Sequence, residues 1–417
     1  MSWRTLKVLR DRNAGIYLGG VIVSGLGDSA MSLAAGIWVK TLTGSSSLAA
    51  LVGFCLWLPT FAGPVIGTVA DRVRRRPLLV ATNLVLAAVM TAPIAVHSQA
   101  DVWLLFAVLT LVGAGMVLTD AAETALVAAA VPEELRGDFN GLVHTAIESM
   151  KLLAPLAGAG LFTAFGGPAV AVLDAATFVL AAVAFRFIRV QEALPTTRGK
   201  RAWTTETAEG ARFLWRHPVL RPLVVTGGTA MVLSSLSSTA TFAMLDTGLH
   251  QSPAYAGVLT PLQGLGSVVS GVTAGALMRR MSERAFSAIG LSLFALGVLA
   301  RATPWLPIVL GGSLAIGLGL PCALIAAMTA VQRETPSELL GRVAATANTL
   351  MFAPTGLALL IGTAMVAGLD YRAQLLIAGA MGLTWAAVLT VAGRAARPTA
   401  PDGAQPTPEA QQIDIAQ

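Results

Sequence analysis

The chain has 417 residues, of which 55% are hydrophobic and 12% charged, with a formal net charge of +6. Soluble domains carry roughly 25% charged residues, and a soluble fold of this length could not bury so much apolar surface, so most of it is expected to face lipid. The excess of basic over acidic residues does not indicate nucleic-acid binding. Lys and Arg gather in alternate gaps between apolar stretches, which is a topology pattern, and they lack interleaved aromatic residues.

Twelve apolar stretches are long enough to cross a bilayer core, which takes about 20 residues per helix. In chain order they are residues 14–40, 47–70, 78–97, 102–124, 140–164, 169–188, 221–245, 254–278, 285–301, 305–330, 341–366 and 371–392. They are rich in Gly and Ala, which suits close helix packing in lipid. The sequence therefore predicts an all-α polytopic membrane protein. The first stretch is too long for a signal peptide and is expected to be retained.

Two short segments recur half a chain apart. Residues 67–77 have a faded copy at 275–281, and residues 132–135 have one at 336–339, with offsets of 208 and 204. Parallel repeats of about six helices are a known transporter architecture. We therefore predict twelve transmembrane helices in two pseudo-symmetric six-helix bundles, residues 1–188 and 221–392. Residues 189–220 form a cytoplasmic linker, and residues 393–417 a disordered cytoplasmic tail.

Part of the linker, about residues 205–217, has the pattern of a helix lying in the membrane interface. Phe213, Leu214 and Trp215 would face apolar lipid, with Arg212 and Arg216 near the headgroups. A plain charged linker fits the same residues equally well.

The distribution of positive charge predicts the orientation. With the N-terminus inside, 24 of the 28 Lys and Arg residues fall on the cytoplasmic side. The outer side keeps Lys40, Arg301 and Arg372. So unequal a division predicts a multi-pass protein of the cytoplasmic membrane with both termini cytoplasmic.

Residues 67–76 resemble the signature loop between helices 2 and 3 of the major facilitator superfamily. The matching residues are Gly67, Asp71, Arg72, Arg75 and Arg76, whereas Val69 and Arg74 replace the usual Leu and second Gly. Residues 26–28, 42–45, 131–135 and 174–178 resemble the twelve-span drug-exporter branch, which includes macrolide efflux proteins and siderophore exporters. Pro155 and Gly158 are similar to part of the antiporter motif of helix 5.

The resemblance implies that this loop is a cytoplasmic latch. Members of the family pair a helix 4 carboxylate with the arginine of the loop, which implies that Asp120 or Glu123 faces Arg75. Asp71 is expected to lie at the N-terminus of helix 11, where the helix dipole stabilises its charge. The second half has Arg279 in the place of Asp71, so the two halves cannot latch identically.

Ionisable side chains within spans are costly and usually functional. Asp28 lies about 21 Å along the first span at 1.5 Å per residue, and the resemblance implies that this helix lines the transport cavity. A carboxylate there suits reversible binding of a proton or a substrate. The alternative is a carboxylate bonded to the backbone of a neighbouring helix.

Three further charged residues lie within spans. Glu148 and Lys151 are three residues apart and share one helix face. They form either an ion pair that fixes packing or a proton- or substrate-binding site with an exchanging partner. Asp174 lies near the start of its helix, where a negative charge is stabilised by the dipole, and is expected to be structural.

The chain lacks a phosphate-binding Gly-rich loop, metal-ligand spacing and a nucleophile constellation, so we expect no ATP use, cofactor, metal or enzymatic activity. We expect a secondary active transporter that exports amphipathic or hydrophobic small molecules in exchange for protons by alternating access. Its expected partners are this substrate, protons and the lipid bilayer. The alternatives are an importer or lysophospholipid transporter of the same fold, and, in another class, a non-transporting membrane sensor or enzyme.

Overall fold

A computed structural model describes residues 8, 10–63, 65–66, 72–190, 209–336 and 339–395. In this part of the chain, nine helices are long and apolar enough to cross a membrane. Three further helices complete the twelve predicted spans. One is short, one carries Glu148 and Lys151 in its sequence, and one is rich in Gly, Ser and Thr.

The first six spans form one bundle. They are α2 (Arg12–Thr43), α3 (Ser46–Trp57) with η1 (Leu58–Ala62), α5 (Arg75–Val89) with η2 (Ala92–Ala95), α6 (Val102–Ala130), α7 (Glu133–Phe165) and α8 (Gly167–Phe187). Short η3 (Gln99–Asp101) leads into α6. Helix α2 packs on α7 and α8, and α5 packs on α6 and α8. The Asp11 side chain caps the start of α2, and Gly44 ends it with a φ of 67° that favours glycine.

The last six spans form a second bundle. They are α10 (Leu220–Thr239) with α11 (Thr241–Ala243) and η4 (Met244–Gly248), then η5 (Pro253–Tyr255) with α12 (Ala256–Met278), α13 (Glu283–Ala300), α14 (Leu306–Glu334), α15 (Leu340–Phe352) with α16 (Pro354–Gly368), and α17 (Tyr371–Ala395). The span predicted for residues 341–366 is divided between α15 and α16, because Pro354 lacks the N–H that a continuous helix needs.

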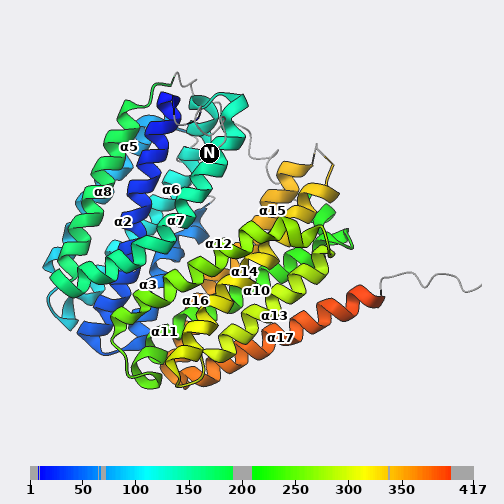
Figure 1. Ribbon diagram of the computed structural model, residues 1–417. Helices are drawn as coiled ribbons and strands as arrows, with labels where there is room; N and C mark the ends of the chain where they lie inside the picture. Colours follow the sequence, from blue (N-terminus) through cyan, green and yellow to red (C-terminus); the bar gives the residue numbers. More distant parts are fainter. Residues whose placement is uncertain are drawn as a thin grey trace, which may run out of the picture.

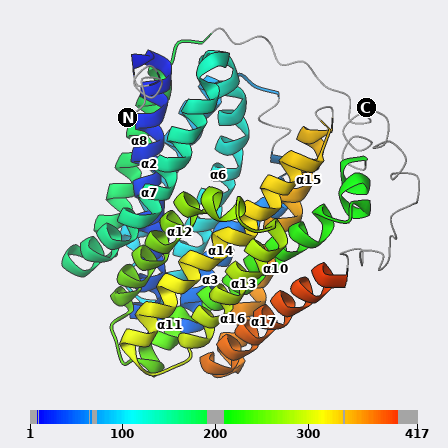
Figure 2. The same cartoon turned by 45° about the vertical axis from the view of Figure 1, so that its right-hand side comes forward.

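The most extensive contacts between the two bundles are those of α7 with α12 and of α3 with α16, and α3 also contacts α10 and α11. Figures 1 and 2 show the bundles close together around α11 and α3, and spread apart toward the end where α2 begins. We call that second end the basic end, since the helix termini there carry Arg12, Arg76, Arg186, Arg280, Arg284 and Arg333. The other end is called the opposite end.

Of the predicted linker the structure describes residues 189–190 and 209–220, and residues 209–216 are helical. Leu214 is fully buried and belongs to a core cluster with Phe286 and Met351 of the second bundle. The prediction that Leu214 faces lipid is therefore wrong, because α13 and α15 supply apolar neighbours for it. Trp215 remains exposed, and Arg342 in α15 donates to Glu209 at 2.6 Å, which ties this helix to the second bundle.

Candidate functional site

Asp28 lies near the middle of α2 and is held by its own helix. Ser24, one turn earlier, donates to Oδ2 of Asp28 at 3.1 Å. Oδ1 of Asp28 is buried, and no described residue donates a hydrogen bond to it. A buried acceptor without a donor is costly, so this oxygen marks the carboxylate as a place where a proton or a small polar molecule can bind.

Asp28 faces a small cavity inside the first bundle that has both polar and apolar lining residues. The cavity holds about 30 Å³ of space for water-sized molecules, enough for about two or three waters at about 10–15 Å³ each. Its polar lining comes from α2, α5 and α6, and consists of Ser24, Asp28, Asn83, Thr119 and Glu123. The family resemblance implied that Asp28 lies on the transport cavity between the two halves. The structure instead places Asp28 among the helices of the first bundle.

Glu123 contributes a second carboxylate to this cavity. The Tyr17 hydroxyl donates to Oε2 of Glu123 at 2.6 Å. Tyr17 is buried and packs edge-on against Phe139 and Phe185, with ring centroids 5.4 and 5.9 Å apart. Glu123, which the resemblance implied as a partner of Arg75, is therefore held by Tyr17. The sequence reasoning did not select Tyr17, Asn83 or Thr119, because none of them carries a charge.

Asp174 lies beside this site in α8. It is 1% exposed, its Oδ1 accepts from the Thr177 hydroxyl at 3.3 Å, and its Oδ2 has no partner among the described residues. A Cβ at Gly27 of α2 would collide with Oδ1 of Asp174 and with the Thr177 hydroxyl. Gly27 thus lets a third carboxylate approach α2 one residue before Asp28.

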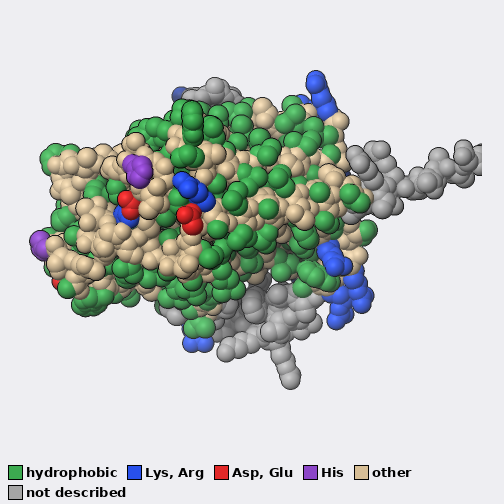
Figure 3. Space-filling model, turned by 90° about the horizontal axis from the view of Figure 1, so that it is seen from below, with side chains coloured by type: hydrophobic (Ala, Val, Ile, Leu, Met, Phe, Trp, Pro, Cys, Tyr) green, Lys and Arg blue, Asp and Glu red, His purple; other side chains and the backbone are tan. Residues whose placement is uncertain are grey.

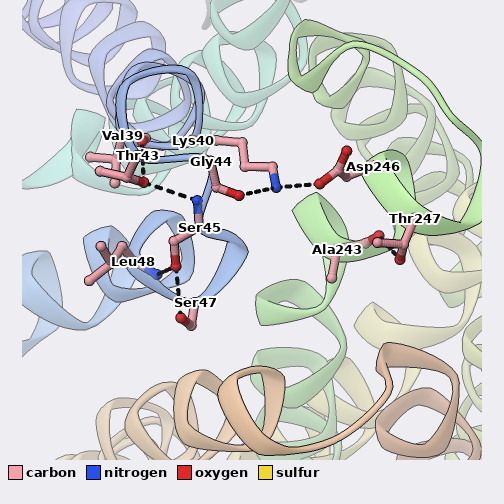
Figure 4. Close-up of polar contacts among 10 residues, drawn as sticks. All are labelled: Val39, Lys40, Thr43, Gly44, Ser45, Ser47, Leu48, Ala243, Asp246 and Thr247. Atoms are coloured by element: carbon pink, nitrogen blue, oxygen red, sulfur yellow. Dashed lines mark hydrogen bonds and ion pairs between the residues drawn. The ribbon is translucent and has the colours of Figure 1, made fainter. Parts of the chain in front are cut away.

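The two bundles are joined at the opposite end by an ion pair. Lys40, 6% exposed near the end of α2, places its Nζ 2.5 Å from Oδ2 of Asp246 in η4 and 2.6 Å from the carbonyl oxygen of Gly44 (Figure 4). One turn deeper, a Cβ at Gly36 would lie 2.7 Å from the Phe242 ring. Figure 3, which views this end, shows few charged side chains among hydrophobic and neutral groups.

Both of these contacts join equivalent positions of the sequence repeat. Lys40 and Asp246 are 206 residues apart, and Gly36 and Phe242 have the same separation. This value lies between the offsets of 204 and 208 found in the sequence. Equivalent positions meet only near a two-fold axis, so these residues lie close to the pseudo-two-fold axis that relates the bundles. The repeat offset was therefore a signal that could have predicted the pair.

The signature loop lies only partly within the described residues. Gly67 and Asp71 lie outside them. Arg72 is exposed in a turn, and Arg75 begins α5. Arg76 donates to the backbone carbonyl of Arg186 at the end of α8, which ties the loop to its own bundle.

The remaining predicted residues lie on α6 and α7. Asp120 is exposed on α6. The backbone of Glu148 and Lys151 lies in α7, and their side chains are outside the described part. Gly158 packs against α2, where an added Cβ would lie 2.5 Å from the Ala30 carbonyl oxygen, and the carbonyl of Pro155 lies 3.3 Å from a Cβ built on Gly257 of α12. The antiporter-like motif thus lies where α7 contacts both bundles.

Two six-helix membrane bundles packed against each other define a transporter of the alternating-access architecture. The family model of the Major Facilitator Superfamily matches residues 17–248 and 227–413. The chain belongs to this superfamily and is a membrane transporter, as the signature loop predicted.

Individual relatives are distant. The chain is 31% identical over 127 residues to the multidrug resistance protein B homolog of two Mycobacterium tuberculosis strains, and this match spans 28% of the chain and 24% of the relative. The chain thus covers about a quarter of the length of these curated relatives.

Solved structures share the fold at low identity. A peptide transporter, POT, in complex with alafosfalin has a TM-score of 0.70 at 17% identity, covering 92% of this chain and 95% of its own. A bacterial homologue of the iron transporter ferroportin in the inward-facing state has a TM-score of 0.68 at 16% identity. The match covers 93% of this chain and 100% of that one. A bacterial homolog of the human lysosomal transporter Spinster, inward-facing and unoccupied, has a TM-score of 0.66 at 13% identity. The match covers 94% of this chain and 98% of that one.

Proposed function

We propose that this transporter exports amphipathic or hydrophobic small molecules in exchange for protons. The observation that carries the proposal is the small cavity in the first bundle, which Asp28 and Glu123 both line and where the buried Oδ1 of Asp28 has no donor among the described residues. Carboxylates removed from water take up and release a proton as their surroundings change, and ionisable groups at membrane depth mark proton pathways in transporters.

In this proposal Asp28 is the coupling carboxylate and Glu123 its neighbour in the same cavity. A proton on Oδ1 of Asp28 removes a negative charge beside Asp174 and relieves repulsion between two carboxylates in a medium of low dielectric constant. Helices α2 and α8 can then pack differently against each other. Because α2 also carries the Lys40 contact to the second bundle, a change in α2 reaches the interface between the bundles.

In the proposed alternating-access cycle, the basic end and the opposite end open and close in turn. The basic end is assigned to the cytoplasm by its Arg content, so the bundles are closed on the outer side and spread on the inner side. Outward opening requires the Lys40–Asp246 ion pair to break. The signature loop, with Gly67, Asp71, Arg72, Arg75 and Arg76, is proposed to close the inner side, with Asp71 at the start of α15 near Arg342.

Three observations support the direction and the substrate class. The name of the multidrug resistance relative favours export, as does the retention of Pro155 and Gly158 at the contact of α7 with α12. The scarcity of charged residues in the spans argues against a polyanionic nutrient, whose site would need several Arg or Lys at membrane depth. Import, or movement of a lysophospholipid, is the alternative.

Two measurements test the proposal. Expression in an efflux-deficient host should lower accumulation of hydrophobic compounds, and a protonophore should reverse the effect. Purified protein should release protons when an exported compound is added, and Asp28→Asn should abolish that release. Gradient-dependent uptake of a hydrophilic nutrient, with drug accumulation unchanged, would show that the direction and substrate class are wrong.

A further inference from the structure

A groove runs along the lipid-facing side of the first bundle, between α2 and α8. Its volume is about 430 Å³. Its apolar walls come from Ile16 and Val23 of α2 and from Val183 and Phe187 of α8, and Arg12 lines it at the basic end. Figure 1 shows α2 and α8 side by side along this face.

The groove has the length of one membrane leaflet. From Arg12 to Val23 it extends roughly 16 Å at 1.5 Å per residue, close to half of a hydrocarbon core of about 30 Å. It stays open because α2 offers glycines along it. A Cβ at Gly19 would meet no atom within 4 Å. The groove therefore fits one extended acyl chain of a single leaflet.

The charge at the basic end of the groove favours an anionic headgroup. Arg12, Arg186 and Arg189 are exposed there, and Arg12 has no ion-pair or hydrogen-bond partner among the described residues. The adjacent acid, Asp11, is engaged as the cap of α2, where it accepts from the Ala14 N–H at 2.9 Å. Arginine binds phosphate through charge-assisted hydrogen bonds, and basic sites beside transmembrane helices bind anionic lipids.

We propose that this groove binds one anionic phospholipid from the leaflet at the basic end, with its phosphate on Arg12 and an acyl chain over Gly19. The site adjoins the carboxylate cavity. Gly20 lines both the groove and the cavity that holds Asp28 and Glu123. A bound chain would therefore lie over Gly20, which the groove shares with the cavity of these carboxylates.

Lipid retention by the full chain tests this site. The protein is reconstituted in vesicles with equal parts of palmitoyl-oleoyl phosphatidylglycerol and phosphatidylcholine, extracted mildly, and examined by native mass spectrometry. The wild type should retain one lipid, preferably phosphatidylglycerol. Arg12→Gln should lower that preference about fivefold, the factor contributed by one basic residue near an anionic headgroup. Gly19→Leu, which fills the groove, should lose the retained lipid.

Matched variants separate this site from ordinary lipid contact. Gly311→Leu adds the same side chain at an exposed glycine of α14 with no atom within 4 Å of its Cβ, and Arg280→Gln removes an exposed arginine at the basic end of the second bundle. Both should retain lipid like the wild type. If Gly19→Leu fails to fold, Val183→Trp fills the groove from α8. Equal retention by wild type and groove-filling variants, or equal loss in Gly311→Leu, overturns the proposal.

Discussion

Removing the charge of Asp246 should weaken closure of the opposite end. Lys40 is buried at 6% exposure and has two acceptors, Asp246 and the carbonyl oxygen of Gly44. In Asp246→Asn, the ammonium keeps the carbonyl but loses its only carboxylate among the described residues. Because Lys40 and Asp246 belong to different bundles, the loss acts on the closed arrangement of this end and not on the folding of either bundle.

The magnitude follows from the exposure of the two partners. A hydrogen bond to a charged group contributes about 1.5–3 kcal/mol. The Asp246 side chain is 52% exposed, and solvent screening reduces the contribution of an exposed partner. The free-energy difference between the closed and open forms of this end should therefore change by about 1–2 kcal/mol. This changes the ratio of closed to open molecules by about 5–30-fold.

Distances across the opposite end measure this shift. Spin labels at Ala164→Cys, at the end of α7, and Ala367→Cys, at the end of α16, report the separation of the bundles, since both positions are exposed. The two native cysteines are buried. Asp246→Asn should populate longer distances. The charge-swapped double variant, Lys40→Asp with Asp246→Lys, should return the distribution toward that of the wild type.

The control is Asp101→Asn, which makes the same change at the same end. Within the described part of the chain, Asp101 bonds only to residues of its own loop, accepting from Ser98 at 2.8 Å and from the His97 N–H at 3.2 Å. These bonds lower the pKa of the Asp101 carboxyl, Ser98 contributing most, yet they join no second bundle. A distance distribution in Asp246→Asn no different from that in Asp101→Asn would refute the assignment.

Three further predictions concern the first bundle. Asp28→Asn should abolish proton-driven uphill transport in proteoliposomes while sparing downhill exchange, and full uphill transport would remove Asp28 from coupling. Tyr17→Phe should displace the pH profile of transport, because Glu123 loses its 2.6 Å donor, whereas an unchanged profile would leave Tyr17 with a packing role alone. Gly27→Ala should destabilise the protein by about 1–3 kcal/mol through overpacking, measured as a lower Tm in detergent. Gly19→Ala, whose Cβ meets open space, should leave the Tm unchanged, and equal effects would contradict this account of Gly27.

The sequence predicted the twelve spans because an apolar run of about 20 residues has few alternatives to a membrane helix. It did not predict which face of each helix meets which neighbour. In lipid a helix can be apolar all round, so periodicity does not separate a protein-facing side from a lipid-facing one. For this reason Asp28 was correctly placed near the middle of its span, yet expected between the bundles and not inside the first one.

The carboxylates of the first bundle can be compared with the equivalent positions of the second bundle. At the repeat offsets of 204 to 208, the positions equivalent to Asp28, Glu123 and Asp174 fall within residues 232–236, 327–331 and 378–382, none of which is ionisable. The second bundle therefore has no counterpart of the carboxylate cluster. The carboxylates of the proposed coupling site therefore lie in the first bundle.

The same symmetry explains why the charges at the interface are unlike. Equivalent residues on a two-fold axis face each other, so identical charges there would repel, and identical large side chains would collide. Lys40 faces Asp246, and Gly36 faces the ring of Phe242. A duplicated chain can close along its axis only after the two copies have diverged into complementary residues at these positions. The pairing of opposite charges, and of a small with a large side chain, lets the two bundles approach closely at this end.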